Sequence, residues 1–333
     1  MNCQKSRFFS DLYIRFITKE YVMPDVVITE FMDQSAVDDL AAQFDVYYSP
    51  DLVDQPDELT EALSDARAII VRNRTQVRQG LLDQAPNLQV VGRLGVGLDN
   101  IDVRACEQRG ATVYPATGAN DIAVAEYVVG TAMLLARQAY TASDKVVSGV
   151  WPRQNCIGRE VYGQVMGLIG CGSIARETAM RAQALGMSVI AFDPYVNADD
   201  RVWNEIGRKE SLDDLLAASD IVSLHIPLTD STRNLLDADA LSKLKEGAIL
   251  INTARGRIVD EMALIEAMKS GRVSGAAMDV FASEPVDAAG GQRFADIPNL
   301  LLTPHIGGVT EQSNVRVSSM IADVVATHLG EAK

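Results

Sequence analysis

Cysteine is scarce in this chain of 333 residues, and its few copies are scattered. Cys3, Cys106, Cys156 and Cys171 are far apart, and no two of them form a C-x-x-C pair. A zinc site or a disulfide framework needs a closer and more regular spacing. The sequence therefore indicates no metal site and predicts a reduced protein of the cytoplasm.

Basic residues are also few, and the chain has no long apolar run. It has 30 Lys and Arg against 45 Asp and Glu, which gives a formal net charge of -15. Because a nucleic-acid backbone is bound by a basic surface, we expect no nucleic-acid partner. The longest apolar stretch, 122–136, contains Glu126 and falls short of the roughly 20 residues that span a bilayer. It predicts a buried helix, and we expect no membrane partner.

The first 22 residues resemble neither a domain nor a signal peptide. Asp11 interrupts their apolar residues, and no small-residue cleavage site follows. We expect residues 1–22 to be a disordered tail or an upstream extension ahead of Met23.

From residue 23 onward, short β-rich runs alternate with amphipathic stretches. This rhythm implies parallel sheets with helices on both faces, and a long helix predicted from Asp121 to about Val147 separates two such series. A last helical pattern, 311–329, is expected to pack on the first series. The predicted fold class is α/β, with two doubly wound parallel-sheet domains. The predicted strands are 26–31, 46–48, 68–71, 89–91 and 111–114, then 165–169, 188–192, 221–225, 248–252, 275–279 and 300–303.

A glycine-rich turn after the strand at 165–169 predicts a dinucleotide site. Gly170 permits a tight turn, Gly172 lets a pyrophosphate approach the backbone, and Ala175 allows close helix packing. Asp193 ends the next strand, where an acid bonds the adenosine ribose, and its negative charge favours NAD over NADP. A second turn, Gly95-Val96-Gly97, lacks the later acid. It is either a simple turn or a substrate loop.

Hydride transfer requires a residue that moves the substrate hydroxyl proton, and histidine suits that task near neutral pH. Of three histidines, His328 is expected at the surface and His225 in a structural position, whereas His305 lies in TPHIGG at the predicted cofactor edge. Glu284, in MDVFASEP, leaves a neighbouring strand end and is the candidate carboxylate partner of His305. Arg255, in NTARGRIVD, is the candidate clamp for a substrate carboxylate.

At this point the chain closely resembles the D-isomer-specific 2-hydroxyacid dehydrogenase family. The matching segments are RLGVGLDNID, VAEYVVGTAMLLAR, VWPR, GLIGCGSIA, HIPLT, NTARGRIVDE, MDVFASEP and LTPHIGG. The resemblance implies an NAD-binding Rossmann domain at 121–306, inserted in a flavodoxin-like substrate domain at 23–120 and 307–333. It also implies homodimerisation through the helix after residue 121, and it supports the roles of Arg255, Glu284 and His305. The implied cofactor contacts, beyond Gly170 and Gly172, are Ser173, Ile174, Asp193, Thr253, Ala254, Asp279 and Gly308.

Three arginines of the first series suggest a substrate with a second anionic group. Arg72 and Arg74 lie in VRNRT, and Arg93 precedes the loop Gly95 to Gly97, whose backbone could hold a carboxylate. Ordinary surface charges remain the alternative. Within the family the chain most resembles sulfolactate dehydrogenases and next phosphoglycerate dehydrogenases, which predicts NAD-dependent oxidation of a 2-hydroxy acid. A different class, an NAD-sensing co-repressor-like binding module, would keep the fold but recognise a peptide.

Overall fold

The structure is a computed structural model that describes residues 23–138, 140 and 142–331. Our expectation for residues 1–22 lies outside the described residues. The chain divides into two compact units: unit 1 is Met1–Thr117 with Asn314–Lys333, and unit 2 is Gly118–Ser313. Each unit is built on its own sheet.

Unit 1 contains a five-stranded sheet in which every strand is parallel to its neighbours. The strand order is β2-β1-β3-β4-β5, which is the flavodoxin-like order. The strands are β1 (Val26–Ile28), β2 (Val46–Tyr48), β3 (Ala68–Val71), β4 (Val90–Arg93) and β5 (Thr112–Pro115), and the helices between them are α2 (Gln34–Ala41), α3 (Pro56–Leu63), α4 (Gln79–Leu82) and α5 (Val103–Gln108), with a short 3-10 turn η2 (Leu52–Asp54).

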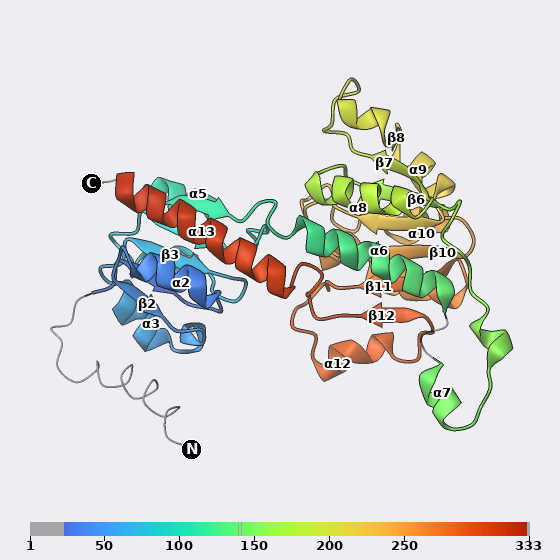
Figure 1. The fold of residues 1–333 in the computed structure, drawn as a ribbon, viewed down its shortest axis with the longest axis horizontal. Coiled ribbons are helices and arrows are strands. Elements are labelled where there is room, and N and C mark those ends of the chain that lie inside the picture. Colours follow the sequence, from blue (N-terminus) through green and yellow to red (C-terminus); the bar gives the residue numbers. More distant parts are fainter. Residues whose placement is uncertain (1–22, 139, 141, 332–333) are drawn as a thin grey trace, which may run out of the picture. The chain divides into compact units, whose positions relative to one another are not determined.

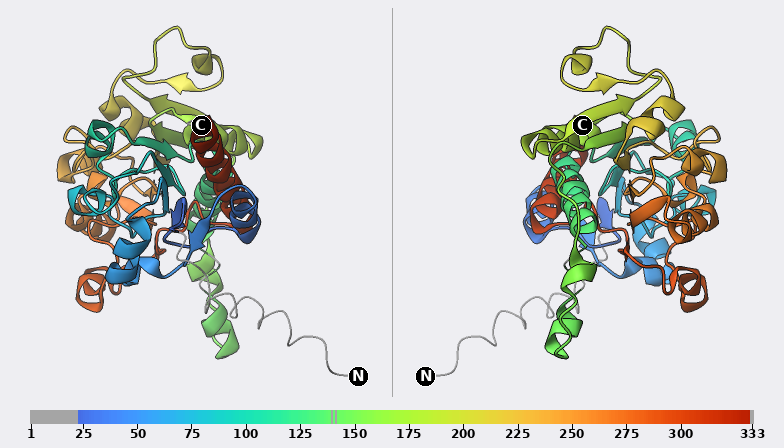
Figure 2. Two further views of the ribbon diagram at one scale, coloured as in Figure 1. Left: turned by 90° about the vertical axis from the view of Figure 1, so that its left-hand side faces the viewer. Right: turned by 90° about the vertical axis from the view of Figure 1, so that its right-hand side faces the viewer.

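The last helix, α13 (Glu311–Glu331), packs on this sheet and lies beside α2 (Figures 1 and 2). Gly92 of β4 leaves room for it, because a Cβ there would stand 2.6 Å from the Ile321 side chain. The Asp33 N–H donates to Ser318 Oγ at 3.0 Å, and Arg67 donates to the Leu329 carbonyl at 3.1 Å. The prediction that the terminal helix returns to the first series is confirmed.

Unit 2 contains a seven-stranded parallel sheet in the order β12-β11-β10-β9-β6-β7-β8. The chain runs outward from β6 in one direction and then returns to start again at β9, so the Rossmann switch point lies between β6 and β9. The strands are β6 (Val165–Ile169), β7 (Ser188–Phe192), β8 (Gly207–Arg208), β9 (Ile221–Leu224), β10 (Ala248–Asn252), β11 (Val273–Met278) and β12 (Leu300–Leu302). Together with unit 1, this sheet confirms the predicted fold class.

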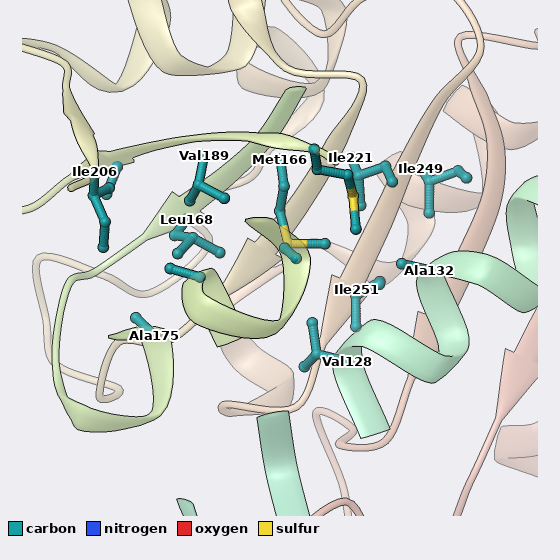
Figure 3. Packing of buried hydrophobic residues seen from close by; sticks show 14 of the residues in the cluster. Val128, Ala132, Met166, Leu168, Ala175, Val189, Ile206, Ile221, Ile249 and Ile251 are labelled. Carbon is teal, nitrogen blue, oxygen red and sulfur yellow. The ribbon is translucent and has the colours of Figure 1, made fainter. Parts of the chain in front are cut away.

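Helices cover both faces of the second sheet. On one face lie α6 (Asp121–Arg137) and α8 (Ser173–Ala184), and Figure 3 shows Val128 and Ala132 of α6 against Ile249 and Ile251 of β10. On the other face lie α9 (Leu212–Ala218), α10 (Ala238–Ser242) and α11 (Glu261–Lys269). Strands buried on both faces read as continuous apolar runs, which is why AILIN and VMGLI were recognisable in the sequence.

Two features of unit 2 differ from the sequence-based prediction. The helix predicted from Asp121 to about Val147 ends at Arg137, because Gln138 adopts a left-handed conformation with φ of 53°, and a separate helix α7 covers Ser143–Val147. The edge strand β8 was not predicted, since a two-residue exposed strand has no apolar pattern. The remaining short elements are η3 (Arg153–Cys156), η4 (Arg201–Asn204), η5 (Gly256–Ile258), α12 (Ala288–Gly291) and η6 (Gln292–Phe294). Within residues 23–331, the described part of the chain has no helix long and apolar enough to cross a bilayer.

Candidate active site

The predicted chemistry-bearing residues of unit 2 follow the carboxyl ends of its strands. Gly170 follows β6, Asp193 follows β7, Arg255 lies three residues after β10, Asp279 follows β11, and His305 lies three residues after β12. Parallel strands end at one edge of the sheet, where ligands of this architecture bind. Figure 1 shows β10, β11 and β12 side by side at this part of the sheet.

The glycine-rich turn has the geometry that a pyrophosphate needs. Gly170 has φ of +94°, and a Cβ there would stand 2.5 Å from the His225 carbonyl oxygen, so only glycine fits. Gly172 caps the 12-residue helix α8, and within the described chain no heavy atom lies within 4 Å of where its Cβ would be. The first helical residues, Ser173 and Ile174, carry backbone N–H groups that point out of the helix end. The turn therefore presents an open anion-binding helix terminus.

Asp193 joins this turn to the end of β7. Its Oδ2 accepts the Cys171 N–H at 2.8 Å, and its Oδ1 accepts the Tyr195 N–H at 2.9 Å. Each carboxylate oxygen retains acceptor capacity for a ribose hydroxyl. Cys171 is buried, and burial raises the pKa of its thiol, so it is held as an inert packing residue.

Two buried polar atoms at the same edge lack partners among the described residues. They are Thr253 Oγ1 and His225 Nε2. Buried polar groups are normally satisfied, so such atoms mark where a ligand supplies the missing partner. Ala254 follows Thr253 in a turn that Asn252 holds, since the Ala254 N–H donates to Asn252 Oδ1 at 3.0 Å. Together with the open terminus at Gly172, these groups fit a dinucleotide.

His305 and Glu284 form the pair that the sequence predicted. His305 Nδ1 lies 2.7 Å from Glu284 Oε2, and Glu284 Oε1 accepts the Phe281 N–H at 2.8 Å. Burial works to raise the pKa of Glu284, but the hydrogen bonds from His305 and Phe281 and the nearby charge of Arg255 hold it below its usual value. Glu284 is therefore ionised near neutral pH. An ionised carboxylate accepts the Nδ1 proton, which leaves Nε2 of the neutral ring as the free base.

Arg255 belongs to the same cluster. Its guanidinium donates to the Ala254 carbonyl at 2.6 Å, and its charge acts on Glu284. The next residue, Gly256, touches the segment that carries Glu284, because a Cβ on Gly256 would stand 1.9 Å from the Phe281 carbonyl carbon. The structure thus brings together the three residues that the sequence proposed from three separate motifs.

Asp279 holds the turn that carries His305. Its buried carboxylate accepts from Thr303 Oγ1 and from the N–H groups of Ile306 and Gly307, each at 2.7 Å. Its carbonyl also accepts the His305 N–H at 2.8 Å. His305 has φ of 56°, a left-handed conformation that a non-glycine residue adopts only when its surroundings impose it. Asp279, which we predicted as a cofactor contact, has this additional structural use.

The arginines of unit 1 have different environments. Arg72 is engaged by its own unit: it donates to Asn314 Oδ1 at 2.7 Å and lies over the Phe31 ring. Arg74 forms a half-exposed ion pair with Asp54. Arg93 donates to the Leu94 carbonyl at 2.9 Å, folding back over its own loop.

The backbone N–H groups of the VRNRT turn already bind a carboxylate from the protein itself. Glu30, which is almost fully buried, accepts the N–H groups of residues 72–75 at distances of 2.9 to 3.2 Å. Although burial raises the pKa of Glu30, these hydrogen bonds outweigh it and lower the pKa below its usual value. The side chains of this turn, and not its backbone amides, therefore remain for a substrate.

The loop at Gly95 to Gly97 has an unusual backbone. Gly95 has φ of +148°, and a Cβ there would stand 1.6 Å from Arg93 Nη1. Val96, at its tip, is exposed. The guanidinium of Arg93 therefore lies directly against this loop, so the two features proposed for substrate binding share one place in unit 1.

Several residues around the pair of His305 and Glu284 were not predicted from the sequence. Tyr127 of α6 contacts Thr303 Oγ1 at 2.6 Å, and the Asn120 side chain occupies the space where a Cβ of Gly308 would be. Glu261 and Arg293 form an ion pair next to the Glu284 segment. Glu261 and Tyr127 lay within segments that carried the family resemblance, but nothing local indicated their partners.

The sequence is similar to a family of known proteins. Residues 129–307 match the family model described as D-isomer specific 2-hydroxyacid dehydrogenase, NAD binding domain. An (S)-sulfolactate dehydrogenase from Chromohalobacter salexigens is 48% identical over 308 residues, which cover 92% of this chain and 99% of that protein. A D-3-phosphoglycerate dehydrogenase from Synechocystis is 36% identical, and the match covers 93% of this chain but 55% of that protein.

The solved structures agree with this relationship. A D-lactate dehydrogenase from Aquifex aeolicus, crystallised with NAD and lactic acid, superposes with a TM-score of 0.81 at 27% identity. The superposition covers 92% of this chain and 96% of that one.

Proposed function

This chain belongs to the D-isomer specific 2-hydroxyacid dehydrogenase family, and on that premise we propose that it oxidises (S)-3-sulfolactate to 3-sulfopyruvate. Membership makes it an NAD-dependent oxidoreductase. The observation that carries the choice of substrate is the 48% identity to an (S)-sulfolactate dehydrogenase along almost the whole of both chains. We assign NAD binding to residues 121–306 and substrate binding to residues 23–120 with 307–333.

His305 is the proposed acid-base residue. When bound, NAD supplies the acceptor for the hydride that leaves the substrate carbon. Nε2 of His305 takes the hydroxyl proton at the same time, because Nδ1 already carries the proton bonded to Glu284. The carboxylate of Glu284 stabilises the imidazolium that results. In the reverse direction the same Nε2 returns the proton to the carbonyl oxygen.

Arg255 is the proposed clamp for the substrate carboxylate. Its fork of N–H donors matches two carboxylate oxygens, which orients the hydroxyl-bearing carbon. For the cofactor, we propose contacts from the open terminus at Gly172 to Ile174, from Asp193 to the ribose, and from Thr253, Ala254, Asp279 and Gly308 at the remaining strand ends. The orphaned Thr253 hydroxyl is the observation that best supports this second group.

The sulfonate is proposed to bind arginine side chains of unit 1. The candidates are Arg72, which also contacts Asn314 and Phe31, Arg74, which pairs with Asp54, and Arg93, which lies against the loop Gly95 to Gly97. The loop Gly95 to Gly97 is proposed to contact the substrate beside Arg93. Exchange of Arg74 for Met is expected to raise the KM for sulfolactate more than the KM for lactate, which lacks the second anion.

A substrate panel tests the proposed function. NADH formation is followed with sulfolactate, 3-phosphoglycerate, malate and lactate at equal concentration. We expect kcat/KM for sulfolactate to exceed the others by at least about tenfold, a difference that one additional ionic contact to the substrate supplies. A preference for 3-phosphoglycerate, the substrate named for the 36% identical relative, would replace sulfolactate in the proposal. Turnover of none would favour a binding module.

The catalytic assignment has its own test. His305→Asn is expected to lower kcat by at least about 100-fold, since positioned general bases contribute that much or more. NADH affinity, measured by fluorescence, should stay within about twofold. A kcat within about threefold of the wild type, under 1 kcal/mol on the barrier, removes His305 from the proposed mechanism.

We further propose that the enzyme is a cytoplasmic homodimer that associates through α6 and the segment after it. Ile122 and Met133 are exposed on α6 although apolar, and Trp151 and Ile157 beyond α7 are 78% and 69% exposed. Large apolar side chains that are exposed along one stretch of the chain favour protein contacts. Light scattering during gel filtration should give twice the chain mass, and Trp151→Glu should lower it.

A further inference from the structure

The segment that carries Glu284 is a loop held at several points. It leaves β11 at Asp279 and enters α12 at Ala288. Glu284 bonds His305 with one oxygen and the Phe281 N–H of its own loop with the other. The position of the carboxylate therefore depends on the backbone of residues 281 and 282.

The side chain of Glu261, which lies outside the loop, is hydrogen-bonded to that backbone. It is the first residue of α11, a place where acids are common because the helix dipole favours them. Such acids usually face solvent, but this side chain is only 7% exposed. Its Oε1 accepts the Ala282 N–H at 2.7 Å. The carboxylate thus fixes the peptide group two residues before Glu284.

Arg293 completes the arrangement on the far side of the loop. Its Nη2 lies 2.7 Å from Glu261 Oε2. The guanidinium also lies 4.9 Å from the centre of the Phe294 ring, and that ring meets Phe281 edge to face at 5.8 Å. Residues before and after the loop are tied together by these contacts. Pairing also removes the cost of leaving the charge of Glu261 buried alone.

A third contact acts on the next peptide group, between residues 282 and 283. Arg257 Nε donates to the Ala282 carbonyl at 2.9 Å, and Gly256 lies against the Phe281 backbone. Residue 282 is therefore held by a carboxylate at its N–H and by a guanidinium at its carbonyl. The two contacts act on the loop backbone two residues before Glu284.

We propose that Glu261, secured by Arg293, is a positioning residue that sets the loop backbone so that Glu284 stays bonded to His305. This inference rests on the proposed catalytic role of Glu284. A displacement of about 1 Å in such supporting structure is enough to lower catalytic rates substantially. The groups that act on Glu284 from other elements are His305, which bonds its carboxylate, and Arg255, whose charge lies nearby.

The test compares five proteins on the hydroxy acid that the wild type oxidises fastest. They are the wild type, Glu284→Gln, Glu261→Met, Arg293→Met and a control, Glu266→Gln. Glu266 lies on the same helix and pairs with Lys269 at the exposed surface, so its loss matches the change of charge without touching the loop. For each protein, kcat, the KM for NAD and the pH profile of kcat/KM are measured well below the melting temperature.

We expect Glu261→Met to lower kcat about tenfold. This is less than the roughly 100-fold or more that a well-placed acid-base group contributes, because the pair is displaced and not removed. The pH profile of kcat/KM should move toward lower pH in Glu284→Gln, where His305 loses its carboxylate neighbour, and in the same direction by less in Glu261→Met, where that carboxylate is displaced. Arg293→Met should shift the profile in the same direction by less. The KM for NAD should change less than twofold in all variants, and Glu266→Gln should match the wild type.

Glu261→Gln tests whether the hydrogen bond to Ala282 alone can rescue kcat. Its amide oxygen can still accept the Ala282 N–H, so most of the kcat lost in Glu261→Met should return although the charge is absent. A role in stability alone would lower the melting temperature and leave the pH profile in place.

Failure of this inference and failure of the proposed function give different results. This inference alone is overturned if the pH profile of Glu261→Met coincides with that of the wild type while the profile of Glu284→Gln shifts. If Glu261→Met does not fold, the profile of Arg293→Met decides in its place. Wild-type behaviour of Glu284→Gln itself, or turnover of none of the hydroxy acids, would overturn the proposed function beneath it.

Discussion

His225 gives a quantitative test of the structure through acid stability. Its ring nitrogen Nε2 is buried without a partner among the described residues, and burial lowers the pKa of the imidazole from 6.5 to about 4. In the unfolded chain the same imidazole takes up a proton near pH 6.5, while the folded protein does not. Folding therefore opposes protonation, and stability must fall as the pH drops from above 6.5 toward 4.

The size of this effect follows from proton linkage. Between pH 7.5 and pH 5.5 the unfolded state gains nearly a full proton at His225, whereas the folded state gains almost none. Integration gives a loss of about 1 kcal/mol over this interval. The result hardly depends on the folded-state value, because pH 5.5 lies well above it. This range also stays above the isoelectric point near 4.6, where solubility is lowest.

Urea unfolding of the wild type and His225→Phe at both pH values measures this term. Phenylalanine also has an aromatic ring, but it does not titrate and has no unsatisfied nitrogen. The variant should therefore be at least as stable as the wild type at pH 7.5. The wild type should lose about 1 kcal/mol more than the variant on going to pH 5.5. Parallel losses in the two proteins, with equal m-values, would refute the reasoning that the ring of His225, with its buried Nε2, stays neutral in the folded protein.

Three further predictions concern single side chains. Arg255→Lys should lower kcat/KM for the hydroxy acid by about 100-fold with NADH affinity unchanged, because an ammonium lacks the bidentate fork; an effect on NADH binding alone would place Arg255 elsewhere. Gly172→Ala should weaken NADH binding in a folded protein, whereas Gly170→Ala should lower the melting temperature, since its Cβ would collide with the His225 carbonyl; fluorescence titration and calorimetry separate the two. Glu30→Gln should cost about 2 kcal/mol of stability at pH 7, measured by urea unfolding, because one oxygen can no longer act as a carboxylate acceptor. The pKa of Glu30 is lowered in the folded state, so this contribution is complete above about pH 4.5 and lost as the pH falls through the folded value, and a difference that grew in acid would contradict it.

The fold was largely predictable because it rests on local patterns. Strands such as Ala248–Asn252 are buried on both faces, and their continuous apolar residues are visible without knowledge of their neighbours. The helix end at Arg137 was not predictable, since Gln138 in a left-handed conformation leaves no signature comparable to glycine. The edge strand β8 was missed for a similar reason, because two exposed residues show no alternation.

The site was predictable only in part. Parallel strands place the residues after their carboxyl ends on one edge, so His305, Glu284 and Arg255 could be grouped from their positions after separate strands. Sequence alone could not show that Glu30 fills the amide turn of VRNRT with its own carboxylate. That contact changes the interpretation of the turn, because its side chains and not its amides remain for a substrate.

The succession of strands and helices along the chain, the glycine turn and the candidate acid-base residues are therefore determined by short stretches of sequence, where spacing and residue type act through neighbours along the chain. Tertiary structure alone decided that the carboxylate of Asp279 bonds the turn that carries His305, and that Glu261 bonds the loop that carries Glu284. The physical reason is that a hydrogen bond or ion pair needs its two atoms within about 3 Å, and only the folded chain brings residues so far apart in sequence to that distance.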